Sequence, residues 1–590
     1  MQLKKTKLAG IISLLFCSNA MAVVFSDPPI AVLEDSSRFG PFVSAMDTSS
    51  AATATTTAIN TNTYAQPFMY DIGAPWTYNE YCVYDDDVCY MFWDGTGSGG
   101  SDGFFVWRRN ILSTYAGING PYESESKTSV DGTDIAIPSL LTESRKITAM
   151  TSDNQAGYAT ESGSKIVRRG FYNDIPLVPL GFDDKGGFSA AHDFAKVSLT
   201  GDNGTFSPKT LIVGQASVQW ANADDQSRFD YCFNYSIDDD RYDYDDLYNC
   251  PGFDLQASYW NDDGSVIAYL SNDSATNWIG TGGDAIFIAN AYAINTSGFS
   301  VGFSTQQIYS STSGGRARAT IFKPTVSGTD QLSFAMTEIK KPKTDTGSDY
   351  DNVIRDTVAV DITDKTFVEA SSTFVDAAGT DDPSQAFIVV GNRTYNLPQN
   401  RSYATEFYTY NVASGKTDYP LKDNPIKGAN SQVSKINNDG LVVGWRDARG
   451  ETSPTAEGSA RFQSAFVYDY KLDKSVYLDD LYCKSINENP ADGPIKYRFV
   501  NAISISDNNS DTYTIVANGF DYGNAENYKN RVGSTPVVLS MTVTQADLTD
   551  FDNSSQCPIK ADEPYERSGA GMGWFVLLPT MMLLFRRFKR

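Results

Sequence analysis

The sequence is poor in the residues that most often hold metals. It contains one histidine, His192, and no two cysteines separated by two residues. Structural zinc sites use four Cys or His ligands, commonly in such closely spaced pairs. The chain also lacks an uninterrupted apolar run of the roughly 20 residues that a spanning helix needs. These absences argue against a thiolate metal site and against a helical membrane domain.

Positive charge is scarce as well. The chain has 47 Lys and Arg residues against 72 Asp and Glu residues, which gives a net charge of −25. Seven of the cations lie at the two ends, which hold no acidic residue, so the part between them has a net charge of −32. A body this acidic repels phosphate backbones, and nucleic acid is therefore excluded as a partner. Its carboxylates could instead attract divalent cations.

Residues 1–22 have the three parts of a secretory signal peptide. Three lysines (Lys4, Lys5 and Lys7) precede a short apolar run, and a small-residue stretch ends at Ala22. The expected partner is signal peptidase, with cleavage after Ala22. The alternative is an N-terminal anchor helix, but the apolar run from Leu8 to Phe16 is short for one.

The C-terminal end is built from three different blocks. A linker and small-residue motif (557–570) precede a hydrophobic tail with a basic end (571–590). The apolar part, Trp574 to Phe585, is short and contains Pro579, and the basic end should remain cytoplasmic. A permanent transmembrane anchor is one interpretation. A tail that holds the chain in the inner membrane until a protease removes it is the other.

The order of these blocks resembles the GlyGly-CTERM sorting signal of Gram-negative surface proteins. The resemblance rests on Ser568, Gly569 and Gly571, although Ala570 separates the two glycines. It implies cleavage by a rhomboid-type sorting protease, delivery by the type II secretion machinery, and a final location at the cell surface or outside the cell.

Cysteine usage agrees with export. Cys17 leaves with the signal peptide, and an even number remains, as expected for disulfides in an oxidising compartment. Loop closure favours pairing between neighbours in sequence, which predicts the pairs Cys82–Cys89, Cys232–Cys250 and Cys483–Cys557. Other pairings, and metal binding by thiolates, stay open at this point.

The body carries the pattern of an all-β protein. After an N-terminal strand and a Thr/Ala-rich segment (23–69), one sequence pattern of strands and turns recurs through residues 70–556. In its clearest copy, Val433 to Trp445, two apolar strands flank the turn Asn437-Asn438-Asp439-Gly440, where Asx and Gly suit positive φ. Weaker copies lie near 147–172, 258–268, 293–322, 386–408 and 503–519. Spacings of about 50 residues predict a β-propeller-like array of about six to seven degenerate four-stranded repeats.

The pattern near 290–325 and 430–480 resembles the HAF family of extracellular repeats, although Ser464-Ala465-Phe466 stands where that family has His-Ala-Phe. Together with the tail, the chain looks like a Gram-negative surface protein of a domain-of-unknown-function family. This resemblance implies a propeller-like body and implies no activity.

Three segments invite a chemical interpretation. Asp238, Asp240, Asp243 and Asp245 lie between two cysteines and could bind Ca²⁺, although a solvated acidic loop is the favoured interpretation. Trp76, Tyr81, Tyr84 and Tyr90 could bind a glycan or pack in the core. The G-x-S-x-G match at Gly99 to Gly103 precedes a strand where a nucleophile elbow needs a helix, so it gives no catalytic residue.

We therefore expect an exported cell-surface protein with a non-enzymatic binding or structural role, whose ligand is a surface glycan or a protein. The alternative is a secreted, glycosidase-like hydrolase that uses two paired acidic residues.

Overall fold

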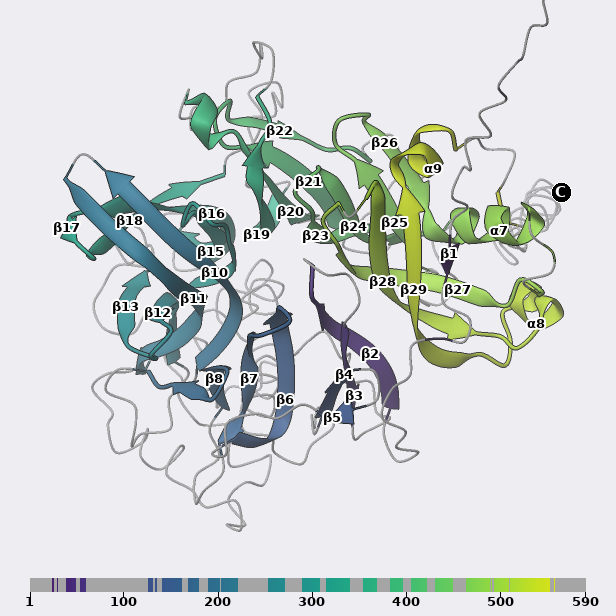
Figure 1. Ribbon diagram of the computed structural model, residues 1–590, viewed down its shortest axis with the longest axis horizontal. Helices are drawn as coiled ribbons and strands as arrows, with labels where there is room; N and C mark the ends of the chain where they lie inside the picture. The colour runs from purple at the N-terminus through teal and green to yellow at the C-terminus, as the bar shows by residue number, and fades with distance from the viewer. Residues whose placement is uncertain are drawn as a thin grey trace, which may run out of the picture.

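The computed structural model describes residues 24–25, 29, 39–48, 54–59, 126–130, 133–134, 141–161, 168–179, 189–201, 203–220, 253–270, 289–307, 315–339, 354–368, 382–395, 405–421, 430–448, 463–488, 490, 493–508, 510–551 and 556–557. Within these residues the strands form seven sheets, six of four strands and one of five. Consecutive strands pair antiparallel, as the turn pattern predicted, and the sheets are arranged as a β-propeller (Figure 1).

We number the sheets along the chain. Sheet 1 contains β2 (Phe39–Met46), β3 (Ala54–Ile59), β4 (Ser126–Val130) and β5 (Thr133–Asp134). Sheet 2 contains β6 (Leu141–Met150), β7 (Gln155–Glu161), β8 (Arg168–Tyr172) and β9 (Ile175–Leu177). Sheet 3 contains β10 (Ser189–Gly201), β11 (Gly204–Trp220), β12 (Phe253–Asn261), β13 (Val266–Leu270) and the short parallel strand β17 (Gly328–Thr329). Sheet 4 contains β14 (Ala289–Ile294), β15 (Ser300–Gln307), β16 (Gly315–Val326) and β18 (Leu332–Glu338).

Sheet 5 contains β19 (Ile354–Thr366), β20 (Phe387–Tyr395), β21 (Thr405–Asn411) and β22 (Lys416–Asp418), with the 3₁₀ helix η2 (Pro383–Gln385) before β20. Sheet 6 contains β23 (Ser431–Ile436), β24 (Leu441–Asp447), β25 (Gln463–Asp469) and β26 (Lys474–Tyr477). Sheet 7 contains β27 (Tyr497–Ile505), β28 (Thr512–Asp521), β29 (Thr535–Thr544) and β1 (Val24–Phe25). The helices are α7 (Leu478–Glu488), α8 (Ala525–Asn530) and α9 (Gln545–Thr549).

The sheets follow one another around a closed ring. The first strands β2, β6, β10, β14, β19, β23 and β27 each contact the first strand of the next sheet, and β27 contacts β2. These seven strands therefore surround the axis of the propeller. Because the strands of each sheet run antiparallel in sequence order, the connections from second to third strand and from one sheet to the next lie at one end of the ring. The remaining turns lie at the other end, which we call the turn end.

The two termini close this ring. At the N-terminus, β1 pairs with β29 and is the outer strand of sheet 7, while β2 is the inner strand of sheet 1. At the C-terminus, residues 545–551 and 556–557, which we call the strap, follow sheet 7 and contact sheet 6 and α7. Lys474 donates from Nζ to the carbonyl oxygens of Thr549 and Phe551, and Cys557 forms a disulfide with Cys483 of α7. This is the Cys483–Cys557 pair expected from the sequence; the other four cysteines lie outside the described residues.

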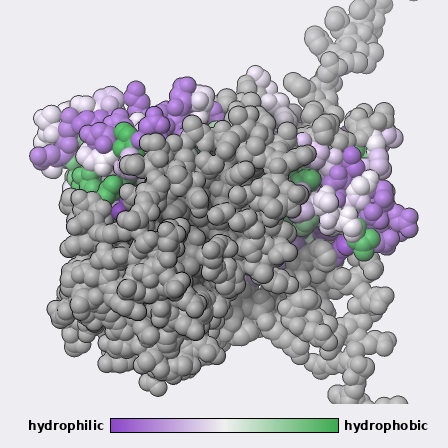
Figure 2. Space-filling view, turned by 90° about the horizontal axis from the view of Figure 1, so that it is seen from below, coloured by the Kyte–Doolittle hydropathy of each residue, from purple (hydrophilic) through white to green (hydrophobic). Residues whose placement is uncertain are grey.

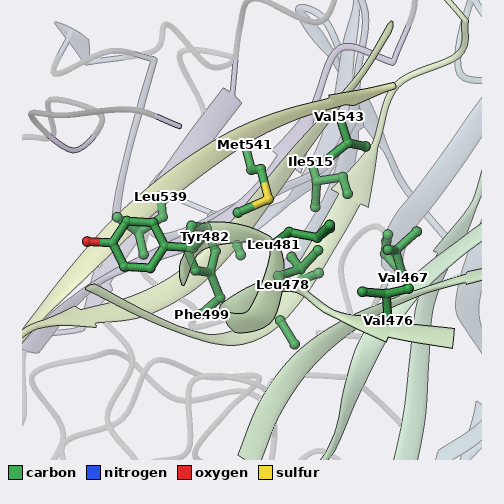
Figure 3. Close-up of a cluster of buried hydrophobic side chains, with 14 of the residues drawn as sticks. Val467, Val476, Leu478, Leu481, Tyr482, Phe499, Ile515, Leu539, Met541 and Val543 are labelled. Carbon is green, nitrogen blue, oxygen red and sulfur yellow. The ribbon is translucent and has the colours of Figure 1, made fainter. Parts of the chain in front are cut away.

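The largest buried cluster lies between sheets 6 and 7. Figure 3 shows Leu478, Leu481 and Tyr482 of α7 pointing toward Phe499, Ile515 and the apolar side chains of β29. The strap joins the same cluster through Leu548, Phe551 and Cys557, which are all buried. The strap is therefore part of the core and not a surface appendage.

One glycine recurs in the second strand of most sheets. A Cβ on Gly444 would overlap the backbone oxygen of Gln432, since the inner strand crosses directly against it. Equivalent overlaps with the inner strand occur at Gly157, Gly214, Gly302, Gly391 and Gly519. This close packing of a second-strand glycine against the inner strand is a property of six sheets.

Two expectations from the sequence need correction. The propeller was expected to begin at residue 70, but β1, β2 and β3 already belong to it. The Thr/Ala-rich segment contains β3, which lies between β2 and β4, because its β-branched threonines suit a paired strand. The turn near Asp262 also differs from its supposed equivalents, since it joins a third strand to a fourth.

In the described part of the chain, no helix combines the length and apolar character needed to cross a membrane. Hydrophilic residues dominate the coloured surface over β17 and β18, on the left of Figure 2. Four large hydrophobic side chains are exposed in the described residues: Met336, Val368, Leu472 and Val532.

Candidate functional site

A cluster of three ionisable side chains near the axis comes from the same position in three inner strands. The pairing of every inner strand with its second strand is interrupted by a shift in register, which resembles a β-bulge. In three sheets this shift lies at 191–193 in β10, 359–361 in β19 and 433–435 in β23. The residues that follow it there are Asp193, Asp361 and Lys435, which we call the axial triad. The same position holds Ala45, Ala149, Ala293 and Asn501 in the other sheets.

Each carboxylate of the triad accepts a backbone hydrogen bond from the neighbouring inner strand. Asp193 Oδ2 accepts a hydrogen bond from the Ile294 N–H at 3.0 Å, and Asp361 Oδ2 accepts one from the Ile436 N–H at 2.8 Å. Lys435 Nζ lies 3.1 Å from Asp361 Oδ1. A bulge leaves backbone groups outside the strand ladder, so these side chains supply the missing acceptors.

Burial and charge shift the titration of all three groups. Burial raises the pKa of the Asp193 carboxyl to about 6, against the opposing effect of the Lys435 ammonium. Burial likewise raises the pKa of Asp361. For Lys435, burial favours a lower pKa, but the carboxylates of Asp361 and Asp193 outweigh it and raise the pKa. Sheets 3 and 6 are separated by two other sheets, so Asp193 and Lys435 can act on each other only across the axis.

His192 stands beside the triad in β10. It is 7% exposed, and its Nε2 lies 3.0 Å from the amide nitrogen of Asn290 on β14. The ring also contacts Tyr158 edge-on and Tyr292 at a tilt. These contacts hold the imidazole among side chains of sheets 2, 3 and 4.

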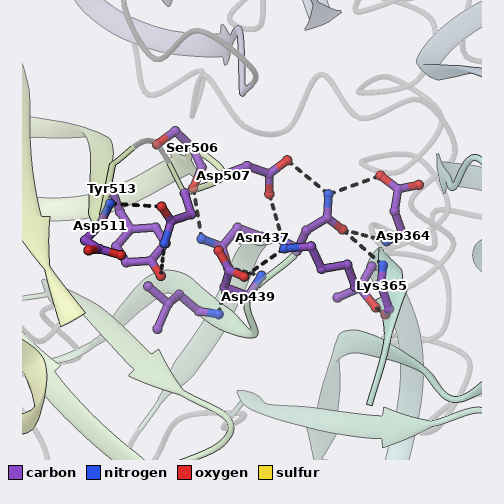
Figure 4. Close-up of polar contacts among 12 residues, drawn as sticks. Asp364, Lys365, Asn437, Asp439, Ser506, Asp507, Asp511 and Tyr513 are labelled. Atoms are coloured by element: carbon purple, nitrogen blue, oxygen red, sulfur yellow. Dashed lines mark hydrogen bonds and ion pairs between the residues drawn. The ribbon is translucent and has the colours of Figure 1, made fainter. Parts of the chain in front are cut away.

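A second polar network runs along the turn end. Thr296 donates from its N–H to Asp364 Oδ1, Asp364 donates from its N–H to Asn438 Oδ1, and Asn438 donates from its N–H to Asp507 Oδ1. The Asp507 N–H then reaches the carbonyl oxygen of Thr48. Figure 4 shows the middle of this network, where Lys365 also pairs with Asp439. Turns of sheets 4, 5, 6, 7 and 1 are joined in sequence.

A buried asparagine holds each of two turns to the next sheet. Asn437 Oδ1 accepts from the N–H groups of Asp439 and Leu441, while its Nδ2 donates to the Ser506 carbonyl. Asn295 makes the equivalent contacts, with Nδ2 donating to the Thr363 carbonyl. The side chain thus satisfies its own turn and the adjacent inner strand at the same time.

We expect Asn437→Ala to lower the free energy of unfolding by about 2 kcal/mol, because it leaves buried backbone groups without partners. Asn501→Ala is the control, since the amide oxygen of Asn501 has only a long 3.5 Å contact with Ser434 Oγ. Chemical denaturation of both variants checks this. Equal losses in the two variants would contradict the assigned role of Asn437.

The residues that the sequence marked as candidate sites fall mainly outside the described residues. This applies to Asp238, Asp240, Asp243 and Asp245, to Trp76, Tyr81, Tyr84 and Tyr90, to Cys82, Cys89, Cys232 and Cys250, and to the processing positions Ala22, Ser568, Gly569 and Gly571. What the structure fixes is where two of these segments attach. The aromatic segment connects β3 to β4, and the acidic segment connects β11 to β12. Both are second-to-third-strand connections, so both attach at the end opposite the turn end.

Asp507 accepts from the Asn438 N–H and from Asn438 Nδ2, so both of its carboxylate oxygens bind the next sheet. Among the described residues, no three His, Cys, Asp or Glu side chains come together as a metal site. The sequence did not reveal the axial triad, because its position emerges only when the pairing of each inner strand is known.

Comparison with known proteins identifies a family for this chain, but that family has no assigned activity. Residues 110–588 match the family described as Protein of unknown function (DUF3466). No curated protein matches the chain. The match covers most of the sequence, and the chain belongs to the DUF3466 family.

Proposed function

We propose that this member of the DUF3466 family is an exported cell-surface protein with a non-enzymatic binding role. The observation that carries the proposal is the use of the charged groups at the axis. Asp193 and Asp361 accept backbone hydrogen bonds from neighbouring sheets, and Lys435 pairs with Asp361. Groups with the chemistry for acid–base catalysis are used here to hold the sheets together.

Export is supported by the Cys483–Cys557 disulfide. Disulfides between buried cysteines persist in oxidising compartments and are rare in the cytosol. The expected route is cleavage after Ala22 by signal peptidase, followed by surface delivery through type II secretion. A rhomboid-type protease would cut the tail near Ser568, Gly569 and Gly571, as the resemblance to the GlyGly-CTERM signal implies.

The end opposite the turn end is the proposed ligand face. Binding residues tend to lie on long connections held by a rigid scaffold. The aromatic segment after β3 and the acidic segment after β11 both attach at this end. Calcium held by Asp238, Asp240, Asp243 and Asp245, together with the aromatic residues of the other segment, would suit a surface glycan or a protein ligand.

The proposal is tested by changing the acidic segment alone. Replacing Asp238, Asp240, Asp243 and Asp245 together by Asn should abolish any rise in melting temperature caused by Ca²⁺. The matched control is Asp262→Asn with Asp263→Asn, on the same sheet but at the turn end, which should keep that rise. A calcium response that survives the fourfold change, or is lost in the control, places the ion elsewhere.

A glycosidase-like hydrolase is the second candidate, favoured by one observation. Asp193 and Asp361 are two carboxyls with raised pKa values near one axis, and a general acid needs a raised pKa. If the chain hydrolyses glycans through them, Asp193→Asn and Asp361→Asn should each abolish product formation. The binding proposal predicts no product from the unchanged protein.

A further inference from the structure

The axial triad takes its three members from sheets 3, 5 and 6 around the axis. Asp193 belongs to sheet 3, Asp361 to sheet 5 and Lys435 to sheet 6, and each sits at the same place in its inner strand. Asp361 is 3% exposed at its side chain and Lys435 is 30% exposed. The pair of Asp361 and Lys435 is neutral, so the carboxylate of Asp193 leaves one net negative charge at the axis when it is ionised.

We propose that Asp193 is the proton-sensitive member of a clasp at the axis, which closes the propeller more tightly in mildly acidic surroundings than in neutral ones. A proton taken from water would add to the carboxylate of Asp193. The other oxygen can keep its hydrogen bond from the Ile294 N–H, and the uncompensated charge disappears. No other bond has to form or break.

The charged groups that face Asp193 are known from each strand around it. Lys435 on β23 stabilises its ionised form, and Asp361 on β19 disfavours it. From β14 the contact is the Ile294 N–H, and in β10 itself the backbone N–H of Phe194 also helps the ionised form. His192 is the neighbouring titratable residue in the chain, and its Nε2 is directed at Asn290.

The direction of the effect follows from the two states. An unfolded aspartate titrates near pH 3.9, whereas burial raises the pKa of Asp193 in the folded chain to about 6. The folded state therefore binds more protons between these values, so this contribution to stability is complete below about pH 4 and is lost as the pH rises through 6. Lys435 keeps its charge throughout this range, because its pKa is raised.

Exposed turn aspartates act in the opposite sense and at lower pH. Hydrogen bonds from Ser265 lower the pKa of Asp263, and hydrogen bonds from Ser207 lower that of Asp330. Their contributions are present above the unfolded pKa and are lost only as the pH falls toward their folded values. Between pH 5 and pH 7.5 they stay ionised in both states and add no slope.

The test is the melting temperature between pH 5.0 and 7.5 for the mature chain, Asp193→Asn and Asp263→Asn. We expect the unchanged protein to lose about 2 °C or more from pH 5.0 to 7.5. Asp193→Asn keeps an acceptor for the Ile294 N–H, and it should lose most of this slope and melt higher than the unchanged protein at pH 7.5. Asp263→Asn, on the same sheet, should keep the slope.

A second variant separates titration from packing. Lys435→Met removes the cation that favours ionised Asp193, so the midpoint of the pH dependence should move to higher pH. The proposal is overturned if Asp193→Asn retains the slope of the unchanged protein, which would assign it to His192 or another group. It is also overturned if the unchanged protein shows no slope, or if Lys435→Met leaves the midpoint where it was.

Discussion

Replacing Cys483 and Cys557 together by alanine is expected to lower the free energy of unfolding by roughly 4 kcal/mol. The disulfide closes a loop across a sequence separation of 74 residues, which restricts the unfolded chain strongly. It also holds Leu548 and Phe551 of the strap in the core between sheets 6 and 7. Chemical denaturation of the double variant under non-reducing conditions measures the loss.

Dithiothreitol provides the control for this prediction. Reduction should bring the unchanged protein close to the double variant and should leave the double variant unaffected. A loss below about 1 kcal/mol in both would mean that the strap packs equally well without the covalent bond, and that its apolar contacts alone close sheet 7 against sheet 6.

Gly444→Ala is expected to lower the free energy of unfolding by about 3 kcal/mol, at the upper end of what overpacking costs. The added Cβ would overlap the backbone oxygen of Gln432. Backbone atoms cannot turn aside as a flexible side chain can, so β23 and β24 would have to separate. Thermal melting and chemical denaturation both report this loss.

Gly201→Ala is the matched control, at the end of β10. Its Cβ would lie 3.7 Å from the Val326 Cβ, an ordinary contact, and the change should alter stability by less than about 1 kcal/mol. Gly302→Ala in sheet 4 should behave like Gly444→Ala, since its Cβ would overlap the Asn290 oxygen. Similar stability of Gly201→Ala and Gly444→Ala would show that the inner strand can move away.

The hairpin that contains Gly444 shows how far the fold could be predicted from the sequence. An Asx-Gly turn between two apolar strands marked the hairpin of β23 and β24 and its weaker relatives, and the second-strand glycine lies within that hairpin. These are local signals, because turn chemistry and close packing depend on residues only a few positions apart. The mostly β propeller of repeated four-stranded sheets followed from them and is confirmed.

Sheet 1 shows where this reasoning fails. Its second strand, β3, has no glycine, and residues 60–125 separate β3 from β4. The pairing that makes β3 a strand is therefore distant in sequence, and the ring closure by β1 is more distant still. The axial triad was missed for a related reason, because residues from three sheets meet only when the ring closes.

The closed ring also clarifies the two termini. The strand that closes sheet 7 lies directly after the proposed cleavage site at Ala22, and the disulfide lies directly before the proposed sorting motif. Both proposed processing positions lie outside the described residues.

The central claim is that the chain binds a surface ligand without chemical conversion. The most direct measurement is a thermal-shift titration of residues 23–567 with Ca²⁺ and a glycan panel, with analysis of released sugars in the same samples. We expect that at least one ligand raises the melting temperature by about 2 °C or more and that no product forms. Product release, or the failure of every ligand to move the melting temperature, would contradict it.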